Sequence, residues 1–156
     1  MAKSLGKKFE DKVKEDWERT FPTSFLYRLQ DQQSRYYGQS SNVSDYIGFV
    51  NKKLFLIECK ETKETTFNWA KLRQYDDLLA QDCKDDTYPG VILWFSAFDK
   101  VVWLNICEIK QMKDDGLKSF NVKMIDNCDY NVYTIPATKL RTFMKCDLSI
   151  FRDIEK

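Results

Sequence analysis

Two short apolar runs, each with an acidic residue, constrain this sequence more than any other feature. Residues 44–50 and 54–60 predict two strands, and the polar residues 51–53 between them predict a tight turn. Side chains alternate between the two faces of a strand, so the second strand sorts into two sets. One face carries Leu54, Leu56, Glu58 and Lys60, and the other carries Phe55, Ile57 and Cys59.

The first strand adds a second acid, Asp45, next to the charged end of the second strand. Desolvating a charge at the end of an apolar strand costs free energy. Lys60 can neutralise Glu58, but that pairing does not explain Asp45. Two carboxylates beside a lysine are the groups that bind a hard divalent cation and prepare a water molecule for deprotonation. The alternative is two surface acids and an ordinary lysine at a strand end, and the spacing alone leaves both open.

The chain contains no histidine. This excludes Ser-His and Cys-His nucleophilic catalysis, histidine general bases and zinc sites that use histidine. Any hydrolysis by this protein therefore depends on carboxylates, lysine or a hard metal ion.

The length of 156 residues predicts a single domain, residues 1–156, that is large enough to bury a core. The five cysteines include no C-x-x-C pair, and we expect no signal sequence before them. They are expected to be reduced thiols in a cytoplasmic protein, in a bacterium or a phage-infected host. No run approaches the roughly 20 apolar residues of a membrane helix, so no membrane association is expected.

The net charge is +1, but the charges are unevenly distributed. Lysines concentrate near the N-terminus, whereas acidic pairs occur later, at 76–77, 85–86 and 114–115. Clustered lysines suit contact with DNA phosphates, although solvated helix faces explain the same pattern. The N-terminal group comprises Lys3, Lys7, Lys8, Lys12 and Lys14.

Hydrophobic periodicity predicts a helix over 5–21, capped by Ser4, and a strand over 25–29. The segment 31–42 is polar and contains Arg35, Tyr36 and Tyr37, which combine charge with stacking surface suited to distorted DNA. A plain surface loop is the alternative for this segment. The elements expected after residue 60 are helices over 67–81, 105–113 and 138–144, strands over 90–95 and 100–104, and a hairpin of 121–125 with 131–135.

Several motifs together resemble one protein family. They are the Asp45–Gly48 and Glu58–Lys63 segments, then Phe67, 80–82, 96–98 and the strand 101–104, with Gly6–Glu10 at the start of the first helix. In order and spacing these are similar to the RecU family of Holliday junction resolvases, within the PD-(D/E)xK nuclease superfamily. The resemblance implies an α/β fold in which a restriction-endonuclease-like mixed central β-sheet is flanked by helices. The polar segment at about 30–44 of this chain would then be a short, stalk-like insertion. In the RecU family the corresponding insertion is a longer stalk.

The resemblance implies a metal-dependent, structure-selective endonuclease that resolves four-way junctions and other branched DNA by hydrolysis. Mg2+, or Mn2+ in its place, would be bound by Asp45, Glu58 and the backbone carbonyl of Cys59, and Lys60 would orient the attacking water. Glu10 would hold a further water, and Gln74 is the candidate for a glutamine that points at the site. The DNA-binding candidates are Lys7, Lys8, Arg35, Tyr36, Tyr37 and Arg73.

Two symmetric cuts across a junction imply a homodimer, and the short insertion and compact chain are in keeping with a phage-encoded member. Two rivals stay open from the sequence. One is a restriction-type or other PD-(D/E)xK endonuclease, although no domain for reading bases in the major groove is evident. The other is a non-catalytic protein that binds branched DNA.

Overall fold

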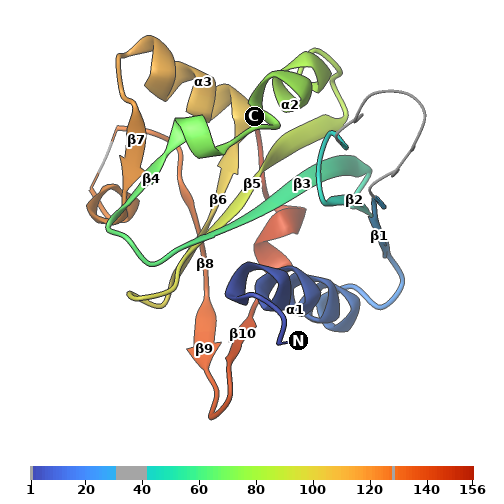
Figure 1. The fold of residues 1–156 in the computed structure, drawn as a ribbon. Helices are drawn as coiled ribbons and strands as arrows, with labels where there is room; N and C mark the ends of the chain where they lie inside the picture. Colours follow the sequence, from blue (N-terminus) through green and yellow to red (C-terminus); the bar gives the residue numbers. More distant parts are fainter. Residues whose placement is uncertain (1, 31–41, 128) are drawn as a thin grey trace, which may run out of the picture.

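A mixed β-sheet runs through the centre of the molecule (Figure 1). The computed structural model describes residues 2–30, 42–127 and 129–156. Within these ranges six strands form the sheet in the order β1-β2-β3-β5-β6-β8. Their bounds are Phe25–Arg28, Tyr46–Val50, Lys53–Thr62, Thr87–Phe95, Lys100–Asn105 and Tyr133–Ile135. The β3–β5 pair is parallel and the other neighbours are antiparallel, which confirms the mixed α/β sheet expected from the sequence.

The β2–β3 hairpin forms as predicted. Val50 pairs with Lys53, which leaves Asn51 and Lys52 as a two-residue turn with φ angles of 51° and 63°. Positive φ at both central residues is typical of the turn whose twist matches a hairpin. The predicted alternation along β3 is also confirmed, because Phe55 and Cys59 belong to one hydrophobic core and Leu56 to the other.

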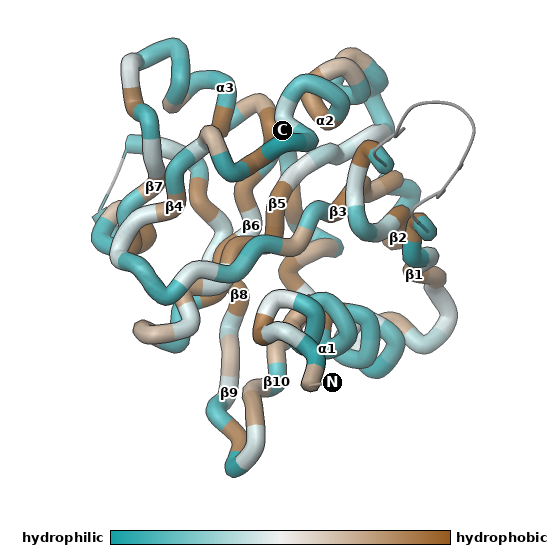
Figure 2. The backbone as a smooth tube through the Cα atoms, viewed as in Figure 1, coloured by the Kyte–Doolittle hydropathy of each residue, from teal (hydrophilic) through white to brown (hydrophobic). Residues whose placement is uncertain are grey.

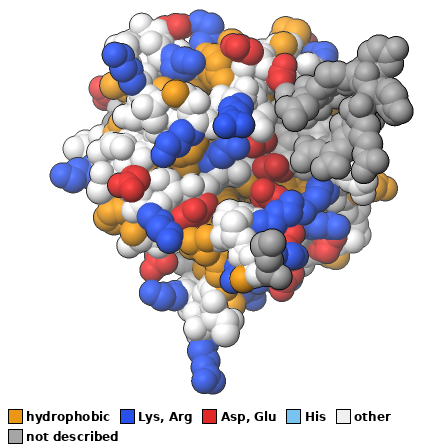
Figure 3. All heavy atoms as spheres, viewed as in Figure 1, with side chains coloured by type: hydrophobic (Ala, Val, Ile, Leu, Met, Phe, Trp, Pro, Cys, Tyr) orange, Lys and Arg blue, Asp and Glu red, His pale blue; other side chains and the backbone are white. Residues whose placement is uncertain are grey.

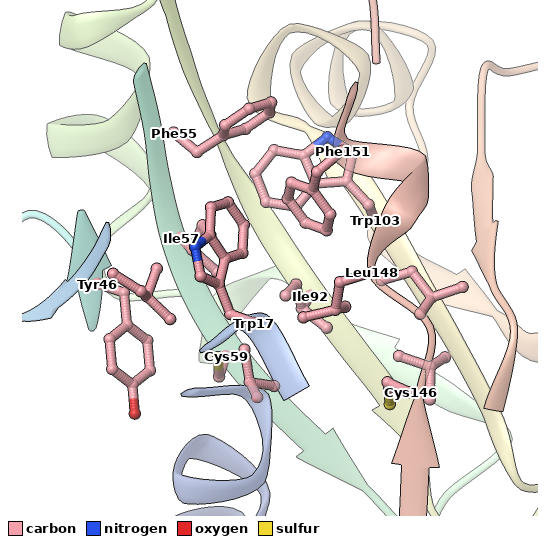
Figure 4. Packing of buried hydrophobic residues seen from close by; sticks show 14 of the residues in the cluster. Trp17, Tyr46, Phe55, Ile57, Cys59, Ile92, Trp103, Cys146, Leu148 and Phe151 are labelled. Atoms are coloured by element: carbon pink, nitrogen blue, oxygen red, sulfur yellow. The ribbon is translucent and has the colours of Figure 1, made fainter. Parts of the chain in front are cut away.

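Helix α1 (Leu5–Thr20) covers one face of the sheet. Ser4 caps it as predicted, since its side chain accepts a hydrogen bond from the Lys7 N–H. Trp17 is fully buried and packs closely on β2: a Cβ at Gly48 would lie 3.0 Å from its ring. Figure 4 shows Trp17 among the aromatic residues of β3, β6 and the C-terminal segment that complete this core.

Helices α2 (Tyr75–Gln81) and α3 (Ile106–Asp114) cover the opposite face. A two-stranded sheet of β4 (Thr66–Asn68) and β7 (Ser119–Asn121) extends this layer. Hydrophobic residues are prominent along β5 and β6 between the two layers (Figure 2), and all nine residues of β5 are buried. The sheet is therefore covered on both sides along β5 and β6, whereas β1 and β2 keep Phe25, Tyr27 and Phe49 exposed.

The single helix predicted over 67–81 is wrong. The segment divides into β4, a 3-10 helix η1 (Trp69–Lys71) and α2. The Asn68 side chain accepts a hydrogen bond from the Ala70 N–H, at 2.9 Å, and so begins a new helical turn. Phe67 pairs with Phe120 in the β4–β7 sheet. This long-range pairing overrides the helical spacing of the apolar residues.

The hairpin predicted between 121–125 and 131–135 is also wrong. Residues Val122–Ile125 form a 3-10 helix, η2, because the Asn121 side chain caps the Lys123 N–H. Strand β8 instead pairs with β6, with Trp103 opposite Tyr133. The second segment is thus a strand as expected, but its partner lies in the central sheet.

Residues predicted as a helix over 138–144 form a hairpin of β9 (Ala137–Lys139) and β10 (Met144–Cys146). The Cys146 N–H donates to the buried carboxylate of Asp16, at 2.8 Å, and Arg19 donates to the Cys146 carbonyl. These hydrogen bonds with α1 hold β10 in an extended conformation. A 3-10 helix η3 (Ser149–Arg152) follows.

Other boundaries differ by a few residues. The helix predicted to end at 21 ends at Thr20, the strand predicted over 25–29 ends at Arg28, and the strand predicted from 90 begins at Thr87. Cys59 and Cys146 are buried free thiols, whereas Cys83 is exposed. Within the described parts of the chain, no helix is both long enough and apolar enough to cross a membrane.

Candidate active site

Asp45 lies immediately before β2 and is fixed to β3. Its Oδ2 accepts a hydrogen bond from the backbone N–H of Cys59, at 2.8 Å. On the other side, the carbonyl of Asp45 accepts from the Leu29 N–H, at 2.9 Å. Because Tyr46, the first residue of β2, is paired with Ile57, the next residues outward are Asp45, just before β2, and Glu58 on β3. The hairpin register therefore places the two acids side by side.

Glu58 is a buried carboxylate in the middle of β3, with only 2% of its surface exposed. Its Oε1 accepts from Lys60 Nζ, at 2.5 Å, which confirms that the two side chains share one face. Its Oε2 is buried and has no hydrogen-bond partner among the residues that the structure describes. Strand β3 therefore presents one satisfied and one unsatisfied oxygen of the same carboxylate.

Both acids open into a pocket of about 150 Å³. It brings together residues from α1, the ends of β1 and β2, β3 and the segment before α2. The lining residues are Lys7, Glu10, Arg28, Leu29, Asn42, Ser44, Asp45, Glu58 and Gln74. Four side chains predicted as catalytic, Glu10, Asp45, Glu58 and Gln74, thus meet in one place.

Glu10 reaches this pocket from α1. Its carboxylate forms an ion pair with Lys7, at 2.8 Å, and lies 3.6 Å from Arg28. The backbone carbonyl of Glu10 accepts a hydrogen bond from the Tyr46 hydroxyl, at 2.9 Å. That hydroxyl also accepts from Arg28, which forms an ion pair with Asp11 at 2.7 Å. The network fixes the position of α1 relative to β1 and β2.

Gln74 is the residue at the N-terminal cap of α2, not a residue within a longer helix as predicted. Its side-chain Oε1 is buried and unpaired within the described ranges. Since Gln74 lines the pocket together with Glu58, two buried oxygen atoms without partners belong to residues of the same wall. Such atoms are costly unless a ligand or ordered water satisfies them.

The pocket perturbs the ionisation of its acids. Burial raises the pKa of Glu58 to about 7, and the nearby Asp45 charge adds to the shift, whereas Lys60 opposes it. Burial also raises the pKa of Asp45, against the hydrogen bond from Cys59. The Cys59 thiol, on the other face of β3, has its pKa raised by burial, which fits the predicted packing role of that side chain.

The donor set suits a hard divalent cation. Magnesium is bound in proteins by one or two carboxylates and completes its shell with water. Across residues 2–30, 42–127 and 129–156, no group of three or more His, Cys, Asp or Glu side chains is arranged as a metal site. The unpaired Glu58 oxygen and the neighbouring Asp45 carboxylate nevertheless offer the oxygen ligands that such an ion takes. Their mutual repulsion would be relieved by a cation between them.

The remaining candidates lie elsewhere. Lys7 is in the pocket, whereas Lys8 and Arg73 are exposed and do not line it. Arg73 immediately precedes Gln74. The predicted DNA contacts Arg35, Tyr36 and Tyr37 lie outside the described residues.

Sequence reasoning missed Arg28, Ser44 and Asn42 as pocket residues. Arg28 is the last residue of β1 and pairs with Tyr46, one residue after Asp45. The signal that could have found it is a basic residue at the end of a strand next to the strand that carries the acid. Ser44 is buried, and its hydroxyl donates to the Tyr46 carbonyl at 2.9 Å.

A family model described as Recombination protein U, RecU, matches residues 21–145, which is more than half of the chain. The chain belongs to the RecU family. The family identified from the motifs is therefore confirmed. The RecU match includes Asp45, Glu58, Lys60 and Gln74 but begins after α1. The positions of Lys7 and Glu10 in the pocket rest on the structure.

Among solved structures, the chain is similar to Hjc, a Holliday junction resolvase from the archaeal hyperthermophile Archaeoglobus fulgidus, at 1.6 Å resolution. The two share 16% identity with a TM-score of 0.45, over 81% of this chain and 85% of that chain. A similarity this distant says nothing about individual site residues. The comparison with curated proteins found no match.

Proposed function

We propose that this RecU-family chain is a Mg2+-dependent endonuclease that resolves four-way DNA junctions and other branched DNA by hydrolysis. The observation that carries the proposal is the pocket that joins Asp45, Glu58, Glu10 and Gln74. Two buried oxygen atoms of its lining residues have no partner among the described residues. Membership of a family of junction resolvases supplies the substrate class. The lack of histidine leaves carboxylates and lysine as the hydrolytic groups.

Asp45, Glu58 and the backbone carbonyl of Cys59 would hold the metal ion. When bound, Mg2+ supplies Lewis-acid stabilisation of phosphate charge and a water of lowered pKa; Mn2+ is expected to substitute. The Cys59 N–H holds the Asp45 carboxylate at 2.8 Å, so this ligand is oriented before the ion arrives. Preorganisation of this kind reduces the cost of assembling the site.

Lys60 and Glu10 have separate roles. The Lys60 ammonium, held at 2.5 Å from Glu58 on the same face of β3, would orient the attacking water and offset negative charge that develops on the phosphate. Glu10 would accept a hydrogen bond from a water in the same pocket, at a distance kept by Lys7 and Arg28. Gln74 would use its unpaired amide oxygen in the same way.

A homodimer is part of the proposal, because two symmetric cuts across a four-way junction require two equivalent sites. Light scattering of the free protein tests this directly. The mass of two chains is expected. The mass of one chain for the free protein, together with one chain per junction in the complex, would contradict the homodimer.

The proposed function is tested with a labelled mobile four-way junction, a Y-fork and a linear duplex, each with Mg2+, Mn2+ or Ca2+. We expect cleavage of the junction with Mg2+ and Mn2+, and binding with little cleavage in Ca2+, which has looser coordination. Cleavage of linear duplex at one fixed sequence, regardless of branching, would instead show a restriction-type endonuclease. Binding of junctions without cleavage in any of the three ions would show a non-catalytic binding protein.

A further inference from the structure

Two adjoining segments next to the catalytic pocket carry four exposed basic residues. They are Lys71, Arg73, Lys113 and Lys118. The first two come from η1 and the residues before α2, and the others from the end of α3 and the connection to β7. We call this group the basic surface. On the face viewed in Figure 3, Lys and Arg side chains gather over η1 and the neighbouring end of α3.

Backbone hydrogen bonds hold the two segments together. The Trp69 N–H donates to the Lys118 carbonyl, at 3.0 Å, and Asn68 pairs with Ser119 in the β4–β7 sheet. Helix α3 ends in a glycine turn, in which Gly116 has a φ of 89° and its N–H donates to the Lys113 carbonyl. Left-handed backbone of this kind favours glycine and fixes the direction of the chain after a helix. The basic surface is therefore built on firmly positioned backbone.

The basic surface adjoins the catalytic pocket through α2. Lys113 Nζ lies 3.7 Å from the centre of the Tyr75 ring, and Tyr75 follows Gln74, which lines the pocket. Arg73 precedes Gln74 in the chain. A long molecule bound at the pocket can therefore extend past Gln74 and contact the basic surface.

A second hollow, of about 560 Å³, lies between the two segments of the basic surface. Its lining includes Lys113, Lys118 and Trp69. Trp69 is 4% exposed, and its indole Nε1 has no hydrogen-bond partner among the described side chains and backbone. The lining of this hollow thus includes two lysines and a tryptophan.

Lys113 contacts the Tyr75 ring, but no carboxylate of the described residues neutralises the charges of the basic surface. None of its four cations forms an ion pair with a carboxylate in the described parts of the chain, whereas nearby acids have other partners. Asp114 pairs with Lys110, and Asp115 accepts from Gln111 and Tyr130. Unpaired cations arranged beside a site for a polyanion are the groups that neutralise phosphates and release counterions.

We infer that Lys71, Arg73, Lys113 and Lys118 bind the phosphate backbone of a duplex arm as it leaves the catalytic pocket, an inference that rests on the proposed function. The phosphate oxygens accept hydrogen bonds from these side chains and fix the direction of the arm without reading its bases. DNA is expected to reach this surface only when the arm is long enough to pass Gln74.

The test compares two triple variants that remove the same charge. One is Lys71→Gln with Lys113→Gln and Lys118→Gln, on the basic surface. The matched control is Lys100→Gln with Arg141→Gln and Lys145→Gln, which are exposed, outside the basic surface and without ion pairs in the described structure. Binding to metal-free four-way junctions with long and with short arms is followed by fluorescence anisotropy over a salt series.

For long arms, the surface variant should bind more weakly. The slope of log K against log salt should shrink by about 2–3, because each phosphate that is no longer neutralised lowers the slope by close to one. The control variant should keep the wild-type slope, and short-armed junctions should bind all three proteins alike. Equal slopes for surface and control variants on long arms would overturn the inference. So would an equally large weakening on short arms.

Cleavage of the short-armed junction in Mg2+ separates this inference from the proposed function. The surface variant should cut it at the wild-type rate. If the wild type cuts it but the long-arm slopes are equal, the inference alone fails. If no protein cuts it and the slopes differ as expected, the proposed function alone fails.

Discussion

The carboxylate of Asp45 accepts a hydrogen bond from the backbone N–H of Cys59, at 2.8 Å. This hydrogen bond ties the acid just before β2 to the strand that carries Glu58 and Lys60. Asp45 is therefore positioned by backbone, whereas Glu58 is positioned by burial and by Lys60. Two acids held independently at one pocket repel each other and raise the pKa of Glu58 beyond the effect of burial.

In the metal-free protein, the contribution of Glu58 to the free energy of unfolding should fall as pH rises from about 5 to 8. Its pKa is about 7 in the folded state, against 4.5 for the ordinary carboxyl. The folded state therefore binds the proton more tightly, and the stabilisation present below pH 4.5 is lost as pH rises through 7. Glu58→Gln should stabilise the metal-free protein at pH 8 by about 1–3 kcal/mol.

Thermal unfolding of wild type and Glu58→Gln across this pH range is the measurement. The control is Glu18→Gln, since the Glu18 side chain is 61% exposed. A wild-type curve that runs parallel to the Glu58→Gln curve would show that Glu58 does not take up a proton on folding.

Lys60→Ala should slow the chemical step by about 10²–10³-fold, the scale seen when one preorganised electrostatic group is lost. DNA affinity should change little, because the ammonium is already paired with the buried carboxylate of Glu58. Single-turnover cleavage with saturating enzyme separates the two effects. Lys63→Ala, an exposed lysine just beyond β3, is the control. A defect confined to binding would make Lys60 a phosphate-binding residue.

Tyr46→Phe should destabilise the protein by about 1–3 kcal/mol, because the Glu10 carbonyl and the Arg28 guanidinium each lose a partner in a partly buried network. Urea unfolding measures this change. Tyr27→Phe is the matched control, since Tyr27 is 68% exposed. Equal unfolding midpoints for the two variants would mean that the Tyr46 hydroxyl does not hold α1 to the sheet.

Much of the site is predictable from the sequence because its geometry is local. A two-residue turn at Asn51 and Lys52 fixes the register of β2 and β3, and strand alternation then puts Glu58 and Lys60 on one face. The same reasoning finds the cap of α1 at Ser4. These features depend on neighbours within a few residues.

The errors arise where distant residues decide the local structure. Phe67 belongs to a strand because Phe120 pairs with it. Cys146 belongs to a strand because Asp16 and Arg19 of α1 bind its backbone. Arg28 enters the pocket because β1 pairs with β2 across a long connection. These partners lie far away in the sequence, so the hydrophobic periodicity of a short segment does not reveal them.

Asp16→Ala tests the interaction that overrides the predicted helix over 138–144. Asp16 is fully buried and accepts from Cys146 and Arg19. Its removal should cost about 2–4 kcal/mol, because a buried N–H and a cation lose their partner. Glu15→Ala, at a side chain that is 68% exposed, should cost much less. Urea unfolding compares the two, and equal midpoints would contradict this role for Asp16.

The most direct test of the central claim is the cleavage and binding of one labelled four-way junction by wild type, Asp45→Asn and Glu58→Gln, in Mg2+. Each substitution removes one ligand charge at the pocket with little change in shape. Wild type should cut the junction, whereas both variants should bind it with similar affinity and leave it intact. Cleavage by either variant at the wild-type rate would contradict the assignment of this pocket as the active site.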